Sequence, residues 1–208
     1  MKIRTVILAL ALASTLSACI PIAATGVGIG IAATIDRRTY GTQIEDGSIE
    51  SRLESRIKEK LGSWGRVSVT SFNRIVLISG EVPSESAKQE AAQQVSTLPY
   101  QIRVVHNEIR VASKASFTRQ SGDALVTSNL KTLLLGSKVV SGAQVKVITE
   151  SGTVYLMGIL TQRESDEAVR IATAASGVHK VVNLAEIVSE EQAKALDHPT
   201  ESPAKTSH

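Results

Sequence analysis

The chain has 208 residues, of which 42% are apolar, 21% charged and only 3% aromatic, with a formal net charge of +3. This length allows one ordinary domain or two small ones, and the composition is that of a folding chain rather than a disordered one. No apolar run is long enough and uninterrupted enough for a polytopic membrane protein. The single cysteine excludes a disulfide framework and a cysteine-based zinc site within one chain.

The first 18 residues have the pattern of an export signal. Lys2 and Arg4 form a short positive region, and a largely Val, Ile, Leu and Ala stretch follows up to residue 16. Leu16-Ser17-Ala18-Cys19 resembles the lipobox of bacterial lipoproteins. An ordinary signal peptide followed by a chance cysteine, or a buried thiol, is the alternative interpretation.

The lipobox resemblance implies a lipid anchor at Cys19. In that family the peptide is cut before the cysteine, the thiol carries diacylglycerol, and the new amine carries an acyl chain such as palmitate. No other cofactor is expected. Ile20 follows the cysteine where enteric lipoproteins retained in the inner membrane have Asp, which implies the outer membrane, facing the periplasm. We expect residues 19–45 to form a lipidated apolar leader and linker.

The signal peptide carries most of the apparent basic charge. Loss of Lys2 and Arg4 from 23 basic residues leaves 21 against 20 acidic residues, a net charge of +1. Global charge therefore argues against a nucleic-acid partner, and any attraction to an anionic surface must be local.

Three blocks of sequence recur in the same order roughly 77 residues apart. They are DGSIESRLESRI and DALVTSNLKTLL, then SFNRIVLISGEV and ESGTVYLMGIL, then VVHNEIRV and VVNLAEIV. The repeat predicts two homologous modules, residues 46–112 and 121–189, joined by a linker over 113–120. Residues 190–208, rich in small polar residues, are predicted to be a disordered tail.

Each module is predicted to run helix, strand, strand, helix, strand. Ile49, Leu53 and Ile57 recur every four residues, as on one face of a helix. Asn73-Arg74 and Ser151-Gly152 are turn pairs between strand-like runs. The simplest packing that buries these stripes is an α+β fold in which two helices cover one face of a small three-stranded mixed sheet.

This repeated unit resembles the BON domain, an αββαβ module of bacterial envelope proteins. The hairpin strand ending in Gly80 or Gly158, the Ala-rich helix after it and the closing VVHNEI or VVNLAEI carry the resemblance. With the lipobox and DRRTYGTQIEDG, the whole chain looks like the dual-BON outer-membrane lipoproteins. That resemblance implies a role in outer-membrane integrity, a place at the division site and binding of anionic phospholipid through the first helix of the second module.

Motifs of catalysis and metal binding are not found. No nucleophile elbow, zinc-protease helix, phosphate loop or calcium loop is present, and His106 and His179 have no carboxylates at metal-ligand spacing. Glu108 and Glu186 occupy similar places in the repeat and are interpreted as solvated strand residues. We expect no enzyme activity, no catalytic residue and no metal.

The first helix of the second module differs from its counterpart in the first. Its inner stripe is predicted to contain Val126, Leu130, Leu133 and Leu134. The residues predicted to point elsewhere include no acidic side chain and suit shallow insertion into anionic headgroups; they are Leu125, Ser128, Lys131, Thr132 and Leu135. The alternative is that Leu125 and Leu135 pack on the other module or on the linker.

Two functional classes therefore stay open. One is a periplasm-facing outer-membrane lipoprotein that binds phosphatidylglycerol or cardiolipin and supports envelope integrity. The other is an adaptor that uses a sheet face or the module interface to hold an outer-membrane assembly protein, a division protein or peptidoglycan.

Overall fold

The structure is a computed structural model and describes residues 36–62, 65–113 and 115–198. Cys19, the predicted signal peptide and the apolar leader up to residue 35 lie outside the described residues, as does the end of the predicted tail from residue 199. The described residues all belong to one compact unit, residues 34–208.

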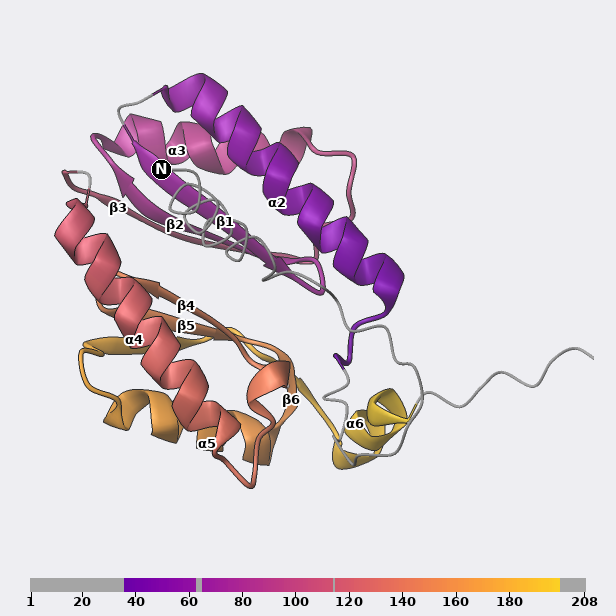
Figure 1. Cartoon of the computed structure of the whole chain (residues 1–208). Helices are drawn as coiled ribbons and strands as arrows, with labels where there is room; N and C mark the ends of the chain where they lie inside the picture. Colours follow the sequence, from indigo (N-terminus) through magenta and orange to yellow (C-terminus); the bar gives the residue numbers. More distant parts are fainter. Residues whose placement is uncertain (1–35, 63–64, 114, 199–208) are drawn as a thin grey trace, which may run out of the picture. The chain divides into compact units, whose positions relative to one another are not determined.

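The first repeat folds as helix, two strands, helix and strand (Figure 1). Its elements are α2 (Tyr40–Leu61), β1 (Arg66–Phe72), β2 (Ile75–Val82), α3 (Glu85–Gln93), which a 3-10 turn over Gln94–Thr97 extends, and β3 (Val104–Val111). The central strand β2 is antiparallel to β1 and parallel to β3. The helices α2 and α3 cover one face of this sheet.

The second repeat has the same order of elements. These are α4 (Phe117–Leu135), a 3-10 turn (Gly142–Gln144), β4 (Lys146–Glu150), β5 (Thr153–Met157), β6 (Ile159–Thr161), α5 (Gln162–Ala174), β7 (Lys180–Asn183) and β8 (Glu186–Val188). The central strand β5 is antiparallel to β4 and parallel to β7, and the short pair β6–β8 continues in the same register. The predicted αββαβ fold is confirmed in both modules.

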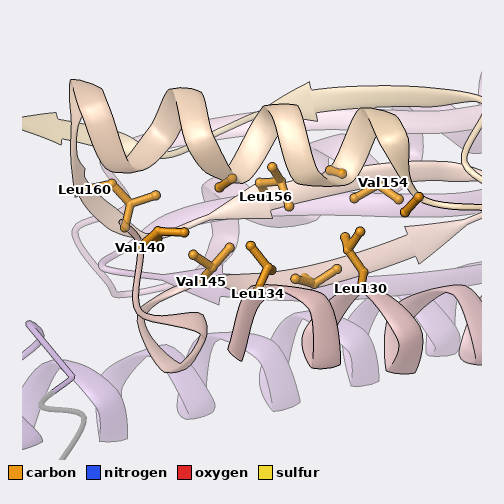
Figure 2. Packing of buried hydrophobic residues seen from close by; sticks show 11 residues of the cluster. Leu130, Leu134, Val140, Val145, Val154, Leu156 and Leu160 are labelled. Carbon is orange, nitrogen blue, oxygen red and sulfur yellow. The ribbon is translucent and has the colours of Figure 1, made fainter. Parts of the chain in front are cut away.

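Each module has a core of its own between its helices and its sheet. In the first, Ile49 and Leu53 of α2 pack with Val76 and Ile78 of β2. Figure 2 shows the corresponding cluster of the second module, in which side chains of α4 and β5 interdigitate. Its labelled members are Leu130, Leu134, Val140, Val145, Val154, Leu156 and Leu160. Full burial of one such side chain stabilises the fold by about 1.5–3 kcal/mol.

A buried aspartate on the first helix of each module holds the hairpin turn. Asp46 accepts hydrogen bonds from both backbone N–H groups of the Asn73-Arg74 turn at 2.8 Å. Asp123 accepts the two N–H groups of the Ser151-Gly152 turn at 2.8 and 2.9 Å. All four turn residues have positive φ, as a two-residue hairpin turn requires. Both predicted turns are confirmed, and the aspartate that opens each repeated block has a structural role.

The uncovered faces of the two sheets pack on each other. Phe72, Ile75 and Leu77 of the first module form one buried cluster with Tyr155 and Met157 of the second. The strand β2 is therefore buried along its whole length, with Val76 and Ile78 facing the helices and Leu77 facing the other sheet. A sheet face is thus unavailable to an outside partner within the described residues.

Arg37, just before α2, is buried against the second module. Its guanidinium donates to both carboxylate oxygens of Glu164 at 2.7 and 3.0 Å, and to the Ile159 carbonyl at 2.8 Å. It also donates to Asp197 at 2.8 and 2.9 Å. Asp197 belongs to α6 (Glu190–Asp197), so one side chain ties the start of the folded body to its end.

Helices extend into three segments that the sequence predicted to be leader, linker and disordered tail. The first helix begins at Tyr40, within the predicted leader 19–45, because Thr39 accepts the Thr42 N–H as its N-cap. The helix α4 begins at Phe117, within the predicted linker 113–120, because Ser116 caps it. Residues 190–197 of the predicted disordered tail form α6, which a capping box of Ser189 and Gln192 opens.

Candidate membrane-binding surface

The helix α4 is fixed to its module along one side only. Leu130 and Leu134 are fully buried in the core, and Asp123 points inward to the hairpin turn. Residues three and four apart lie on the same side of a helix, so the side chains between these positions point away from the core.

Three large apolar side chains lie exposed along the outward side of α4. Phe117, Leu125 and Leu135 have 84%, 72% and 67% of their surface exposed. Ser128 and Thr132 are exposed between them. We call these five residues the α4 outer face; Lys131, which is also exposed, lies at its border.

The exposure of Leu125 and Leu135 decides between the two interpretations of their packing. Neither side chain is buried against the other module or the segment before α4. All five residues predicted to bind phospholipid, namely Leu125, Ser128, Lys131, Thr132 and Leu135, are thus accessible on one helix. Their contact with lipid stays a prediction.

Leu133 was predicted to lie in the inner stripe, and this is wrong. It is 44% exposed. Because successive residues of an α-helix differ by about 100°, Leu133 lies to one side when Leu130 and Leu134 point into the core. It borders a groove between α4 and α5.

The charges along α4 are basic wherever they meet solvent. Asp123 is its only acidic residue, and both oxygens of that carboxylate are occupied by the Ser151-Gly152 turn. Arg119 and Lys131 are exposed. Among the described residues, neither cation is in an ion pair of 4.0 Å or less. A helix with exposed apolar side chains and unpaired cations suits an anionic, partly apolar surface.

Phe117 belongs to the outer face but was missed from the sequence. The apolar periodicity predicted a helix over the block that opens at Asp123, so Phe117 was assigned to the linker. The signal that could have found it is Ser116, because serine is a preferred N-cap and its side chain accepts the Arg119 N–H at 3.3 Å. A helix started there places Phe117 in the first turn.

The first helix of the other module has a different surface. The exposed middle of α2 carries both signs of charge, at Arg52, Glu54 and Lys58. Two of its glutamates also reach the edge strand β1, where Glu54 accepts the Val69 N–H and Glu50 accepts the Ser71 N–H. Acidic side chains oppose contact with an anionic membrane, so the asymmetry between the modules lies on their first helices.

Glu186 is not simply a solvated strand residue, as the sequence had suggested. Arg103 of the first module donates to both of its oxygens at 2.6 and 2.8 Å, and Asn73 donates to one at 2.7 Å. The hydrogen bond from Arg103 holds the pKa of Glu186 below its ordinary value, although partial burial opposes the shift. Glu186 therefore joins the two modules.

The described residues contain no group of three or more His, Cys, Asp or Glu side chains placed to hold a metal ion. Within the same ranges, no helix is both long and apolar enough to span a bilayer. His106 lies on β3, and the imidazole of His179 lies beside Gly152 of the hairpin turn.

Two tandem αββαβ modules define the class of protein. Residues 45–113 and 122–189 each match the BON domain family. The chain therefore belongs to the BON-domain family, as a member with two such domains.

Three similar proteins match this chain over most of their length. The chain is 33% identical over 171 residues to a protein named Outer membrane lipoprotein DolP from Haemophilus influenzae, which covers 81% of this chain and 88% of that protein. It is 33% identical to the 21 kDa hemolysin of Actinobacillus pleuropneumoniae, over 72% of this chain and 78% of that protein. It is 30% identical to Osmotically-inducible protein Y of Escherichia coli, over 69% and 73%. The resemblance to dual-BON lipoproteins is confirmed.

Proposed function

We propose that this protein is a non-enzymatic lipoprotein of the outer membrane, anchored through acyl groups on Cys19 and facing the periplasm. It binds anionic phospholipid, phosphatidylglycerol or cardiolipin, through the α4 outer face. By doing so it supports outer-membrane integrity, with enrichment at the division site. The lipobox residues and the name of the Haemophilus influenzae relative support the location.

The single observation that carries the lipid proposal is the exposure of Phe117, Leu125 and Leu135 on one helix without an exposed acidic residue. Transfer of the exposed part of each side chain into the headgroup region contributes roughly 1–2 kcal/mol. Each basic residue near an anionic surface adds about 1 kcal/mol. A surface of this kind binds weakly in solution and effectively once an anchor holds it beside the membrane.

Vesicle sedimentation tests the proposal. Residues 34–208 should sediment with vesicles that contain phosphatidylglycerol or cardiolipin and stay in solution with purely zwitterionic vesicles. Leu125→Asp or Leu135→Asp should abolish sedimentation, because either places a negative charge on the apolar face. Ile44→Asp is the matched control, since Ile44 is exposed on α2 of the other module. Failure of the unsubstituted protein to bind, or full binding by a folded Leu125→Asp protein, would contradict the proposal.

The anchor is tested separately in cells. Cys19→Ala should release the protein from the membrane fraction into the soluble envelope fraction. A Cys19→Ala protein that still fractionates tightly with the outer membrane would contradict acylation as the anchor.

The adaptor function is the second candidate, and the edge strand β3 is the surface that supports it. The sheet faces are buried between the modules, but Val104, Val105 and Val111 lie exposed on β3, an edge strand. An edge strand with exposed valines can pair with an extended segment of a protein partner. If no anionic vesicle binds, chemical cross-linking from β3 in intact cells becomes the test of a protein partner or of peptidoglycan.

A further inference from the structure

A groove of about 440 Å³ lies beside the α4 outer face, and the two modules form it together. Arg66, the first residue of β1, contributes the side from the first module. The second module contributes residues of α4 and one residue of β4, namely Gln120, Asp123, Ala124, Thr127, Ser128, Lys131 and Thr149. Ser128 belongs both to the groove and to the outer face, so the two are adjacent.

Both cations of the groove reach solvent, while Asp123, the one carboxylate among its lining residues, is buried. The Lys131 ammonium is exposed and has no ion pair within the described residues. Arg66 is 26% exposed at its side chain and donates to Glu150, of which only 6% is exposed. Asp123 has both oxygens on the Ser151-Gly152 turn. The lining of the groove therefore carries two cations and one carboxylate, and both oxygens of that carboxylate are already hydrogen-bonded.

We propose that this groove binds the phosphate of an anionic phospholipid headgroup, so that the first module completes the membrane-binding site of the second. The inference rests on the proposed function. The apolar side chains of the outer face enter the membrane beside the bound lipid. A role for the first module at the membrane follows, which its own charged helix α2 does not provide.

The donors of the groove suit a phosphate. A guanidinium has five N–H donors, and Arg66 uses one nitrogen, Nη1, for its bond to Glu150 at 2.5 Å, so donors remain for a second acceptor. Lys131 adds an ammonium, and Ser128, which is also exposed, adds a hydroxyl. The Thr127 and Thr149 hydroxyls, which also line the groove, bond to each other at 2.7 Å.

Glu150 makes the sharpest test, because it restrains Arg66 and offsets its charge. In the vesicle assay with residues 34–208, Glu150→Gln should raise the affinity for phosphatidylglycerol vesicles. The double variant Arg66→Gln with Glu150→Gln removes the cation without leaving a buried carboxylate unpaired. It should bind about fivefold more weakly than Glu150→Gln alone, and Lys131→Gln should lose a similar factor, since one basic residue near the surface is worth about 1 kcal/mol.

Arg52→Gln is the charge-matched control, because Arg52 is exposed on α2, outside the residues that line the groove. It should change the affinity less than twofold. If removal of Arg66 costs no more than Arg52→Gln while Leu125→Asp still abolishes binding, the groove proposal is overturned and the proposed function stands. If residues 34–208 do not bind phosphatidylglycerol vesicles at all, both fail.

A lipid headgroup and free phosphate share this chemistry, so the ligand source needs its own measurement. In an NMR titration, short-chain phosphatidylglycerol should shift the Arg66 side-chain signal together with the amides of Leu125 and Ser128. Inorganic phosphate at the same concentration should leave the α4 amides unchanged. Equal shifts with both ligands would overturn the assignment to a lipid headgroup.

Discussion

The Arg37 guanidinium is the buried cation that joins the start of the folded body to the second module, and its replacement by methionine tests how the body is held together. Five hydrogen bonds would be lost, to Glu164, Asp197 and the Ile159 carbonyl. Methionine fills most of the volume but leaves Glu164 buried without its partner. Removing one partner of a buried pair costs about 3–5 kcal/mol.

We expect the lower end of this range, about 3 kcal/mol, for Arg37→Met. Asp197 is 31% exposed at its side chain, so water replaces part of what it loses. Glu164 also keeps its hydrogen bond from the Thr161 N–H at 2.8 Å, which belongs to the capping box of α5. For a domain pair of this size, about 3 kcal/mol lowers the melting temperature by roughly 6–12 °C.

Urea unfolding of residues 34–208, followed by circular dichroism, measures the change in free energy. Arg163→Met is the control, because Arg163 is exposed and lies 3.8 Å from Glu190 in a surface pair; it should cost less than about 1 kcal/mol. Hydrogen exchange should also show faster exchange in α6 for Arg37→Met only. Equal losses for Arg37→Met and Arg163→Met would refute the reasoning.

The loss should depend on pH in a direction that the pKa shifts set. Burial opposes ionisation of Glu164, but hydrogen bonds from Arg37 and from the Thr161 backbone bring its pKa below the ordinary value. The hydrogen bond from Arg37 also lowers the pKa of Asp197. A carboxylate with a lowered pKa stabilises the folded state above its unfolded pKa of about 4 and loses that contribution as the pH falls through its folded pKa. The difference between parent and Arg37→Met should be full at pH 7 and shrink below about pH 4.

Three further predictions concern stability, each measured by urea unfolding. Gly80→Ala should destabilise the fold by more than about 2 kcal/mol, because φ is +118° and an added Cβ would lie 2.0 Å from the Arg66 carbonyl oxygen. Gly122→Ala is the opposite case: Gly122 lies on α4 with open space around it, so the substitution should stabilise the fold by up to about 1 kcal/mol. Asp46→Ala should cost more than Asp123→Ala, since Asp46 also accepts from the Ser71 hydroxyl and forms an ion pair with Arg38. Arg103→Met should cost less than about 1 kcal/mol despite its two short bonds to Glu186, because its side chain is 42% exposed.

Local periodicity was enough to predict the modules. Ile49, Leu53 and Ile57 are spaced for one helical face, and all three are buried on α2. The spacing of Thr161 and Glu164 predicts a capping box, which the structure contains. Signals of this kind lie within a few residues of each other, so a single sequence displays them.

The contacts that join the modules could not be predicted in this way. Arg37 meets its partners 127 and 160 residues away, and Arg103 meets Glu186 across 83 residues. No local pattern pairs an arginine with one carboxylate rather than another. Four consecutive apolar residues, 75–78, open β2 and are a sign in the sequence that both faces of the sheet are covered.

One part of the candidate site could be predicted from local spacing, and the other part depends on how the modules pack. The exposure of Leu125, Ser128, Lys131, Thr132 and Leu135 follows from helical spacing once the core side of α4 is known. The place of Arg66 beside Lys131 depends on how the two sheets pack, which no periodicity encodes. A composite groove between repeats is therefore visible only in the folded structure.

The length of chain between Cys19 and Arg37 determines which experiment can measure membrane binding by the α4 outer face. Seventeen residues separate Cys19 from Arg37, and this segment can span at most about 60 Å. The helix α4, with 19 residues, is only about 28 Å long. The acyl anchor proposed at Cys19 would therefore keep the outer face within reach of the same membrane, at an effective concentration in the millimolar range. At that concentration a weak intrinsic affinity is sufficient, and fractionation of the anchored protein reports the anchor alone. Substitutions in α4 must be compared on residues 34–208, where the outer face has to bind without the anchor.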